Sequence, residues 1–267
     1  MAAIHAMAVV ESGALLGAGV EVAPFAVVES GAVLGDGCRI SAHAVVKAHA
    51  TIGANTSVGE HAVIGGDPQD LNFDRTLPNR AIVGCENVLR EGVTIHRGTV
   101  GDSRVGDRNY LMCGVHLGHD VVLGDDCVLA NNVLLAGHVH FGDRIVVGGA
   151  AVFHQFVRVG SLVMVQGMGR VGQDILPFTT EVEFNTVSGL NRVGLKRAGF
   201  DLETRQALRA CFDLFYRSGL SPRLFLEQME NPPPGPVAEM VAFVRAGSKR
   251  GYCQIVAGTR KLTDEEN

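Results

Sequence analysis

The 267-residue chain has no tryptophan, only three tyrosines and no apolar run of membrane-spanning length. A spanning helix needs about 20 consecutive apolar residues, so we expect none. Because aromatics make up only 6% of a chain that is 46% hydrophobic, Val, Leu, Ile and Ala must build its core. The six cysteines are scattered, which favours reduced thiols in a cytosolic protein over a disulfide framework. Residues 1–5 lack the basic start of a signal peptide.

What the chain does contain is a repeat of six residues. Neither a helix, with a period near 3.6, nor a simple strand, with a period of 2, produces this spacing. A hexapeptide β-solenoid does, and three hexads form one triangular coil, so residues 18 apart stack about 4.8 Å from each other. The large apolar positions are Ile4, Val10, Leu16, Val22, Val28, Leu34, Ile40, Val46, Ile52, Val58 and Ile64, then Val83, Leu89 and Ile95, then every sixth residue from Val105 to Val171.

Two interruptions divide the repeat. From Ile64 to Val83 the spacing is one residue longer than a coil, and from Ile95 to Val105 it is four longer than a hexad. Solenoids place extra residues in surface loops, and loops on a rigid scaffold often carry binding groups. A position after large residues is often glycine, as at Gly53, and we expect it to allow a tight corner. Neutral insertion is the alternative to a functional role for both loops.

The repeat fades after about residue 173, and the last part of the chain has helical patterns. Apolar residues at 208, 211, 212 and 215 predict an amphipathic helix that ends near Gly219. Ser221 before Pro222 predicts a helix start, and a final helix is expected near 237–244. We therefore expect a solenoid over 1–191 and a helical domain over 192–267. The latter carries a net charge of +3 and the former −8, which favours an acidic partner.

Histidines are the candidate chemical groups. Counting 18 residues from His119 leads to Gly137, one coil further along, with His138 beside it. A base next to a main-chain N–H suits acyl transfer, because the base removes a proton from a hydroxyl and the N–H holds the oxyanion. Six histidines lie in this part of the chain: His96, His116, His119, His138, His140 and His154.

Other interpretations of the histidines stay open. Any one of them can be a surface residue, as we expect for His5, His43, His49, His61 and His140. His116, His119 and His138 also have the ligand types of a metal site, as in a metal-dependent hydratase built on the same solenoid. A solenoid that serves only as a scaffold is the last alternative.

Several exact strings resemble the UDP-N-acetylglucosamine O-acyltransferase family, which begins lipid A synthesis. They occur in family order over about residues 1–220, and the string at 94–99 is far more specific than the hexads. The strings are Gln69-Asp70-Leu71, Thr94-Ile95-His96-Arg97-Gly98-Thr99, His116-x-x-His119-Asp120, Leu129-Ala130-Asn131-Asn132, Leu135-Ala136-Gly137-His138-Val139, His154-Gln155-Phe156 and Gly194-Leu195-Lys196-Arg197-x-Gly199-Phe200.

The resemblance implies a mainly β fold, a left-handed parallel β-helix followed by a small α-helical C-terminal domain. It implies a cytoplasmic homotrimer with active sites between subunits, which moves a 3-hydroxyacyl group from acyl carrier protein to the 3-hydroxyl of UDP-N-acetylglucosamine. Neither a metal, a cofactor, a nucleic acid nor a membrane span is expected. His119 would be the general base and Gly137 the oxyanion donor. Asp120 would orient His119, although strand alternation turns Asp120 away unless the backbone bends.

The resemblance also implies residues that contact substrate. Gly167 corresponds to the position that limits acyl length, and Asn191 and Arg197 match positions near the uridine diphosphate. The other substrate-binding residues that it implies are Asp70, His96, His116, His138, His154 and Gln155.

The chain departs from the family at the nucleotide end. Asn72 replaces a usual Lys, Val193 an acidic residue and Ala198 a phosphate-binding Arg, while residues 180–186 replace a Gly-Asn-x-Ala segment. Loss of a cation weakens anion binding. The alternative function is therefore acyl transfer to a different nucleotide sugar, for example one with a 3-amino group.

Overall fold

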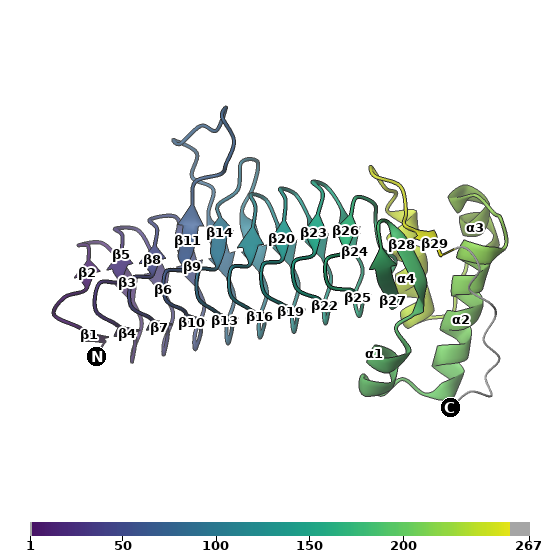
Figure 1. Cartoon of the computed structure of the whole chain (residues 1–267), viewed down its shortest axis with the longest axis horizontal. Coiled ribbons are helices and arrows are strands. Elements are labelled where there is room, and N and C mark those ends of the chain that lie inside the picture. Colours follow the sequence, from purple (N-terminus) through teal and green to yellow (C-terminus); the bar gives the residue numbers. More distant parts are fainter. Residues whose placement is uncertain (1, 257–267) are drawn as a thin grey trace.

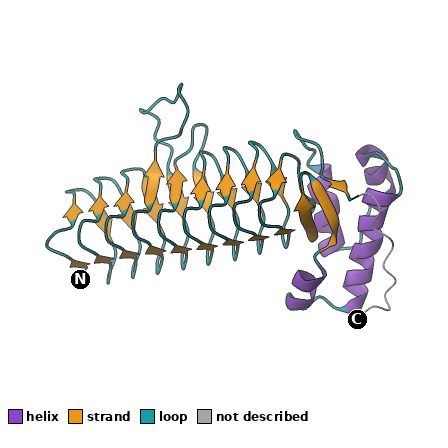
Figure 2. Cartoon of the chain, viewed as in Figure 1, coloured by secondary structure: helices purple, strands orange, loops and turns teal. Residues whose placement is uncertain are grey.

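The computed structural model describes residues 2–256. Two-residue strands wind into a long triangular prism, and helices pack at its C-terminal end (Figure 1; Figure 2). Each strand pairs in parallel with the strand one coil away, for example Val22 with Ile40 and Leu117 with Leu135. This is the parallel β-helix that the hexad pattern predicts. Among the described residues no helix has both the length and the apolar character needed to cross a bilayer.

The prism has three faces, each a sheet. Sheet A has twelve strands: β1 (Ala3–Ile4), β4 (Glu21–Val22), β7 (Arg39–Ile40), β10 (Ser57–Val58), β13 (Val88–Leu89), β16 (Tyr110–Leu111), β19 (Val128–Leu129), β22 (Val146–Val147), β25 (Met164–Val165), β27 (Thr179–Glu183), β28 (Thr186–Leu190) and β29 (Gln254–Ile255). Its last three strands are irregular, because β27 and β28 form an antiparallel hairpin and β29 adds to β28.

Sheets B and C are parallel throughout. Sheet B contains β2 (Val9–Val10), β5 (Val27–Val28), β8 (Val45–Val46), β11 (Val63–Gly66), β14 (Thr94–His96), β17 (His116–Leu117), β20 (Leu134–Leu135), β23 (Val152–Phe153) and β26 (Arg170–Val171). Sheet C contains β3 (Leu15–Leu16), β6 (Val33–Leu34), β9 (Ala50–Ile52), β12 (Ala81–Val83), β15 (Ser103–Val105), β18 (Val122–Leu123), β21 (His140–Phe141) and β24 (Arg158–Val159).

The large hexad residues form one continuous core inside the prism. Val28, Leu117 and Val165 are fully buried, and the small residues two positions earlier, such as Ala26, are buried beside them. The first coil has no neighbour on one side, so Ile4 remains 47% exposed. Each further coil buries the previous one, as expected for a linear repeat.

The expected reason for glycine after the large positions is wrong at Gly53, although it holds at Gly65, where φ is 84°. Gly53 has ordinary backbone angles, but a Cβ there would lie 2.5 Å from the Gly84 carbonyl carbon of the next coil. Close stacking of coils therefore excludes a side chain at Gly53. The left-handed corner lies two residues later, and non-glycine residues such as Asn55, Asp120 and His138 occupy many of these corners.

The four helices follow the hairpin: α1 (Arg192–Arg197), α2 (Leu202–Arg217), α3 (Pro222–Gln228) and α4 (Pro236–Arg245). The predicted cap at Ser221 is confirmed, since its side chain accepts a hydrogen bond from the Leu224 N–H. These helices share a second core, which contains Leu208, Phe225 and Met240. The division of the chain at residue 192 stays a prediction, and residues 257–267 of the second domain lie outside the described part. None of the six cysteines forms a disulfide.

Candidate active site

His119 and Asp120 occupy the corner between β17 on sheet B and β18 on sheet C. Asp120 has a left-handed backbone, with φ of 57°, which turns its side chain back toward its neighbour. His119 Nδ1 lies 2.8 Å from Asp120 Oδ2. The bend that the sequence analysis required is therefore present, and strand alternation does not apply at this position.

The Asp120 carboxylate is held by the second inserted loop. The Thr99 N–H and hydroxyl donate to Oδ2 at 2.9 and 2.6 Å, and the N–H groups of Val100 and Gly101 donate to Oδ1 at 2.9 Å each. Burial raises the pKa of Asp120, but these bonds outweigh it and hold the pKa below its ordinary value. The ionised carboxylate can only accept, so His119 carries its proton on Nδ1 and keeps a lone pair on Nε2.

Gly137 lies against that Nε2 edge, as the 18-residue register predicts. A Cβ at Gly137 would be 2.5 Å from both Nε2 and Cε1 of His119. Asp107 and Asp125 follow strands of sheet C at the position that Gly137 has after sheet B. Their main-chain N–H groups donate to carboxylates of the next coil, from Asp107 to Asp125 and from Asp125 to Asp143. No described residue accepts from the Gly137 N–H. A main-chain donor is thus left open beside the base.

A cavity of about 300 Å³ on sheet B opens onto this pair, and we call it the B-face cavity. His96 and His116 line it, with ring centroids 4.8 Å apart. Burial lowers the pKa of His96 to about 4, helped by the nearby His116 and His119, and burial also lowers the pKa of His116. The Thr94 hydroxyl lies 2.7 Å from His116 Nδ1 and fixes its ring. Both side chains are therefore neutral hydrogen-bonding groups near pH 7.

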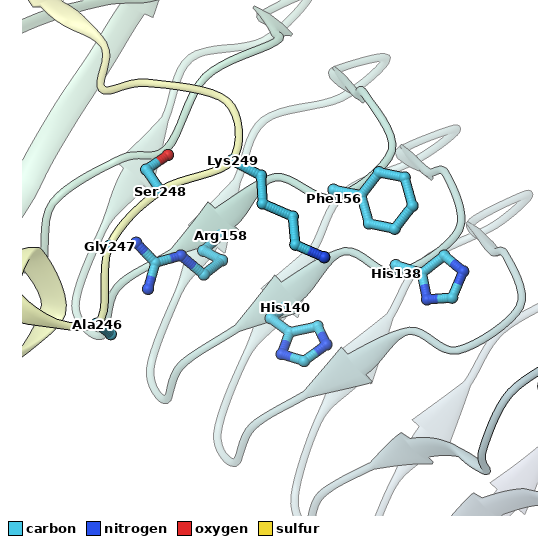
Figure 3. Close-up of a pocket in the computed structure, with 8 residues that line it drawn as sticks. All are labelled: His138, His140, Phe156, Arg158, Ala246, Gly247, Ser248 and Lys249. Carbon is cyan, nitrogen blue, oxygen red and sulfur yellow. The ribbon is translucent and has the colours of Figure 1, made fainter.

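A second hollow, the C-face cavity, lies on the other side of the same corner and measures about 420 Å³. His138 and Phe156 stack at its edge with centroids 4.7 Å apart, and Lys249 reaches across from the loop after α4 (Figure 3). The Lys249 Nζ lies 5.2 Å from the Phe156 ring centroid. Burial lowers the pKa of His138 against the opposing effect of Asp120, and Lys249 lowers it further. The C-face cavity therefore touches the site through His138, but neither His119 nor Gly137 lines it.

Some predicted substrate residues lie outside the B-face cavity. Asp70 is exposed in the first loop, where Oδ1 accepts from the Asn72 N–H, and its neighbour Gln69 lines the cavity instead. His154 lines a separate cavity one coil further along sheet B, and its Nδ1 lies 3.1 Å from the carbonyl oxygen of Gln155.

Three predicted residues lie toward the C-terminal end of the chain, and none lines the B-face cavity. Gly167 follows β25 at an exposed position. Asn191 caps α1 by accepting from the Gly194 N–H, and its Nδ2 donates to the Leu162 carbonyl. Arg197 is exposed at the end of α1. The structure therefore brings together His96, His116, His119, Asp120, Gly137 and His138, but not these three.

The residues that hold the site were not among the predicted site residues. Thr99 binds Asp120, and Thr94 binds His116, although both belong to the quoted string at 94–99. Lys249 and Phe156 line the C-face cavity. Phe156 belongs to one of the quoted strings, whereas no quoted string contains Lys249. Thr99 lies in the second inserted loop and Lys249 in the loop after α4, so hexad spacing carries no signal for these two residues.

His119, Asp120 and His138 form a cluster with the ligand types and spacing of a metal site. The Asp120 Oδ2 atom of this cluster already accepts from the Thr99 N–H and hydroxyl, and it lies 2.8 Å from His119 Nδ1. A bound cation would have to replace these hydrogen bonds. The donor set therefore favours acid–base chemistry over a metal centre.

Comparisons with known proteins agree with the resemblance seen in the sequence. The family described as "Udp N-acetylglucosamine O-acyltransferase; Domain 2" matches residues 174–253, and the bacterial transferase hexapeptide repeat matches residues 31–66 and 102–137. An acyl-[acyl-carrier-protein]–UDP-N-acetylglucosamine O-acyltransferase of Paraburkholderia phymatum is 43% identical over 225 residues, which cover 83% of this chain and 86% of the relative. One from Pseudomonas putida is 40% identical over 237 residues, covering 87% and 91%.

Solved structures show the same likeness. The UDP-N-acetylglucosamine acyltransferase of Bacteroides fragilis has a TM-score of 0.88 and 35% identity, covering 93% of this chain and 98% of that one. The enzyme from Campylobacter jejuni has the same TM-score and identity, with coverage of 94% and 99%. With such identity along nearly the full length of its relatives, the chain belongs to the UDP-N-acetylglucosamine O-acyltransferase family.

Proposed function

We propose that this protein transfers a 3-hydroxyacyl group from acyl carrier protein to the 3-hydroxyl of UDP-N-acetylglucosamine, the first step of lipid A biosynthesis. The observation that carries the proposal is the pairing of an Asp120-oriented His119 with the open Gly137 N–H. The family membership supplies the two substrates. We further propose that the protein is a cytoplasmic homotrimer whose active sites lie between subunits.

The steps follow from the geometry. His119 Nε2 removes the proton from the sugar hydroxyl as its oxygen attacks the thioester carbonyl. The Gly137 N–H donates to the oxygen that becomes negative. The tetrahedral intermediate then breaks its C–S bond, and the leaving thiolate takes the proton from the imidazolium. Asp120 stabilises that imidazolium and keeps the base in the required tautomer.

Replacing His119 with alanine tests the base. We expect kcat to fall about 10²- to 10⁴-fold in an assay with acyl-loaded carrier and UDP-N-acetylglucosamine. His43→Ala is the matched control, because His43 is exposed at a distant corner and stacks only between Phe25 and His61. A His119→Ala enzyme with normal turnover would exclude this mechanism.

A second candidate function is acyl transfer to another nucleotide sugar, such as a 3-amino sugar. Val193 in α1 and Ala198 at its C-cap support it, because neither of these two side chains can bind a charged group of the nucleotide. Residues 180–186 of the β27–β28 hairpin also differ from the family, which has a Gly-Asn-x-Ala segment there. Mass analysis of products from a panel of UDP-sugars decides, since ordinary turnover of UDP-N-acetylglucosamine excludes this candidate.

A further inference from the structure

A separate cavity of about 500 Å³ on sheet B is lined by a cation that has no counter-charge. Arg170 points outward from β26, and its guanidinium carbon lies 5.4 Å from the centroid of the Phe184 ring. Among residues 2–256 no acceptor is hydrogen-bonded or ion-paired to this guanidinium. Stacking on an aromatic ring leaves the edge of a guanidinium available for a planar, two-point contact with an anion.

Two further donors face this cavity, which we call the Arg170 cavity. Arg250 donates from Nε to the Gly172 carbonyl at 3.2 Å, which leaves its terminal nitrogens unused. Asn185 accepts from the Gly172 N–H through Oδ1 at 2.6 Å, so its Nδ2 remains a donor. No Asp or Glu is among the residues that line the cavity. The lining therefore selects for an anion.

The Arg170 cavity adjoins the B-face cavity, because Val152 and Phe153 line both. Between His116 on β17 and Arg170 on β26 lie three strand spacings, about 14 Å. The outward side chains along this path are Leu134 and Val152, which are 44% and 37% exposed. A bound molecule that places an anion at Arg170 thus reaches the reacting corner over an apolar floor.

We propose that the Arg170 cavity binds the phosphate of the phosphopantetheine arm that carries the acyl group. This inference rests on the proposed function, since it names how the donor is held. In a nucleotide sugar the reacting hydroxyl lies only a few bonds from the nearest phosphate, too few to span three strands. In phosphopantetheine a long chain with two amides separates the thioester from the phosphate, which suits the distance.

The experiment compares two donors that differ only in the phosphate, acyl-4′-phosphopantetheine and acyl-pantetheine. Wild type should use the phosphorylated donor with a kcat/KM about 10- to 100-fold higher. Arg170→Ala should lose at least tenfold of that preference, while KM for UDP-N-acetylglucosamine stays unchanged. Arg170→Lys keeps the charge without the planar contact and should lie between the two. Arg39→Ala, an exposed position on β7 of sheet A, is the matched control.

A calorimetric titration with 4′-phosphopantetheine and with pantetheine measures the same contact without turnover. His119→Ala should keep the binding preference for the phosphorylated compound, so failure of the catalytic proposal and failure of this one are distinguishable. The inference is overturned if Arg170→Ala weakens both compounds equally or neither. It is also overturned if the variant loses affinity for UDP-N-acetylglucosamine instead, because the anion then belongs to the acceptor.

Discussion

One slot of the coil, repeated along the prism, serves both the fold and the chemistry. His43 and His61 each occupy a left-handed corner, where they are exposed and contribute only to the surface. In Asp120 the same backbone directs a buried carboxylate toward His119 and the Thr99 loop. Asp and Asn tolerate the left-handed region better than most residues, so this corner supports a catalytic carboxylate at little cost.

Gly137→Ala tests how closely the base and the oxyanion donor must approach. The new methyl group would overlap His119, since its Cβ would lie 2.5 Å from Nε2. The N–H remains, so a loss of kcat reports displacement of the ring, and we expect about 100-fold. Gly149→Ala is the control in the same hexad slot, because its Cβ would meet only the Asn131 carbonyl oxygen at 3.3 Å. Steady-state kinetics showing equal activity for both variants would contradict the prediction.

Glu181 is a charged residue in an inward slot of the hexad lattice. It pairs with Val165 in sheet A and is fully buried, and neither carboxylate oxygen has a hydrogen-bond partner in the described structure. Burial raises its pKa from 4.5 to about 7. The folded state therefore keeps a proton that the unfolded state releases, and stability falls as the pH rises from about 4.5 to 7.

Glu181→Gln should remove this penalty. We expect the variant to gain about 3 kcal/mol of unfolding free energy at pH 8, since one pKa unit corresponds to 1.36 kcal/mol. The gain should shrink as the pH falls from 7 toward 4.5, because below 4.5 wild-type Glu181 is mostly neutral in both states. Thermal unfolding of both proteins at several pH values measures it, and a gain that does not change with pH would show that ionisation is not its cause.

At the scale of elements, the two inserted loops are built differently from the coils. Loop 67–80 is held by Arg97, which is 2% exposed and donates to Asp67 at 2.9 Å and to the carbonyls of Leu77 and Arg75 at 2.7 and 3.0 Å. Its guanidinium also lies 4.7 Å from the Phe73 ring centroid. A buried cation thus replaces the apolar core that the loop lacks, and it places Gln69 at the B-face cavity.

Arg97→Met should release this loop while the solenoid stays folded. Loss of the charged hydrogen bonds favours the open loop by about 3 kcal/mol, more than a hundredfold in its population. Trypsin should then cut after Arg75 much faster, and kcat/KM for UDP-N-acetylglucosamine should fall about tenfold. Arg108→Met is the control, because Arg108 forms exposed ion pairs with Asp107, Asp125 and Asp126. Unchanged proteolysis of the Arg97 variant would show that other contacts hold the loop.

The sequence predicts the site wherever the hexad register runs without interruption. His119 and Gly137 are one coil apart with no insertion between them, so counting 18 residues places them correctly. Gln69 and Thr99 lie in insertions, whose paths depend on Arg97 and Asp120 instead of on any period. The inward position of Glu181 could not be predicted from the hexads either. The last coil is shortened, so a residue of an irregular hairpin pairs with Val165 and points inward.

At the scale of the molecule, the helices close only one end of the prism (Figure 1). Phe212 of α2 joins the solenoid core, which covers the last coil, whereas the first coil keeps Ile4 exposed. The His119 corner lies in the middle coils, but Asn191 and Arg197 belong to the capped end. Neither the B-face cavity, the C-face cavity nor the Arg170 cavity is lined by both groups. We propose that a substrate that contacts both groups does so between two chains of the homotrimer.

Trimers assembled from two different variant chains test that proposal. His119→Ala and Arg197→Ala homotrimers should each have low activity. If a site takes its base from one subunit and its nucleotide contact from the neighbour, each mixed trimer pairs two intact halves at one of its three interfaces, about a third of the sites. Co-expression of differently tagged chains, followed by purification on both tags, should therefore restore turnover to roughly that fraction of wild type. If each site were complete within one chain, no site would carry both intact residues, and the mixed trimer would stay as inactive as its parents.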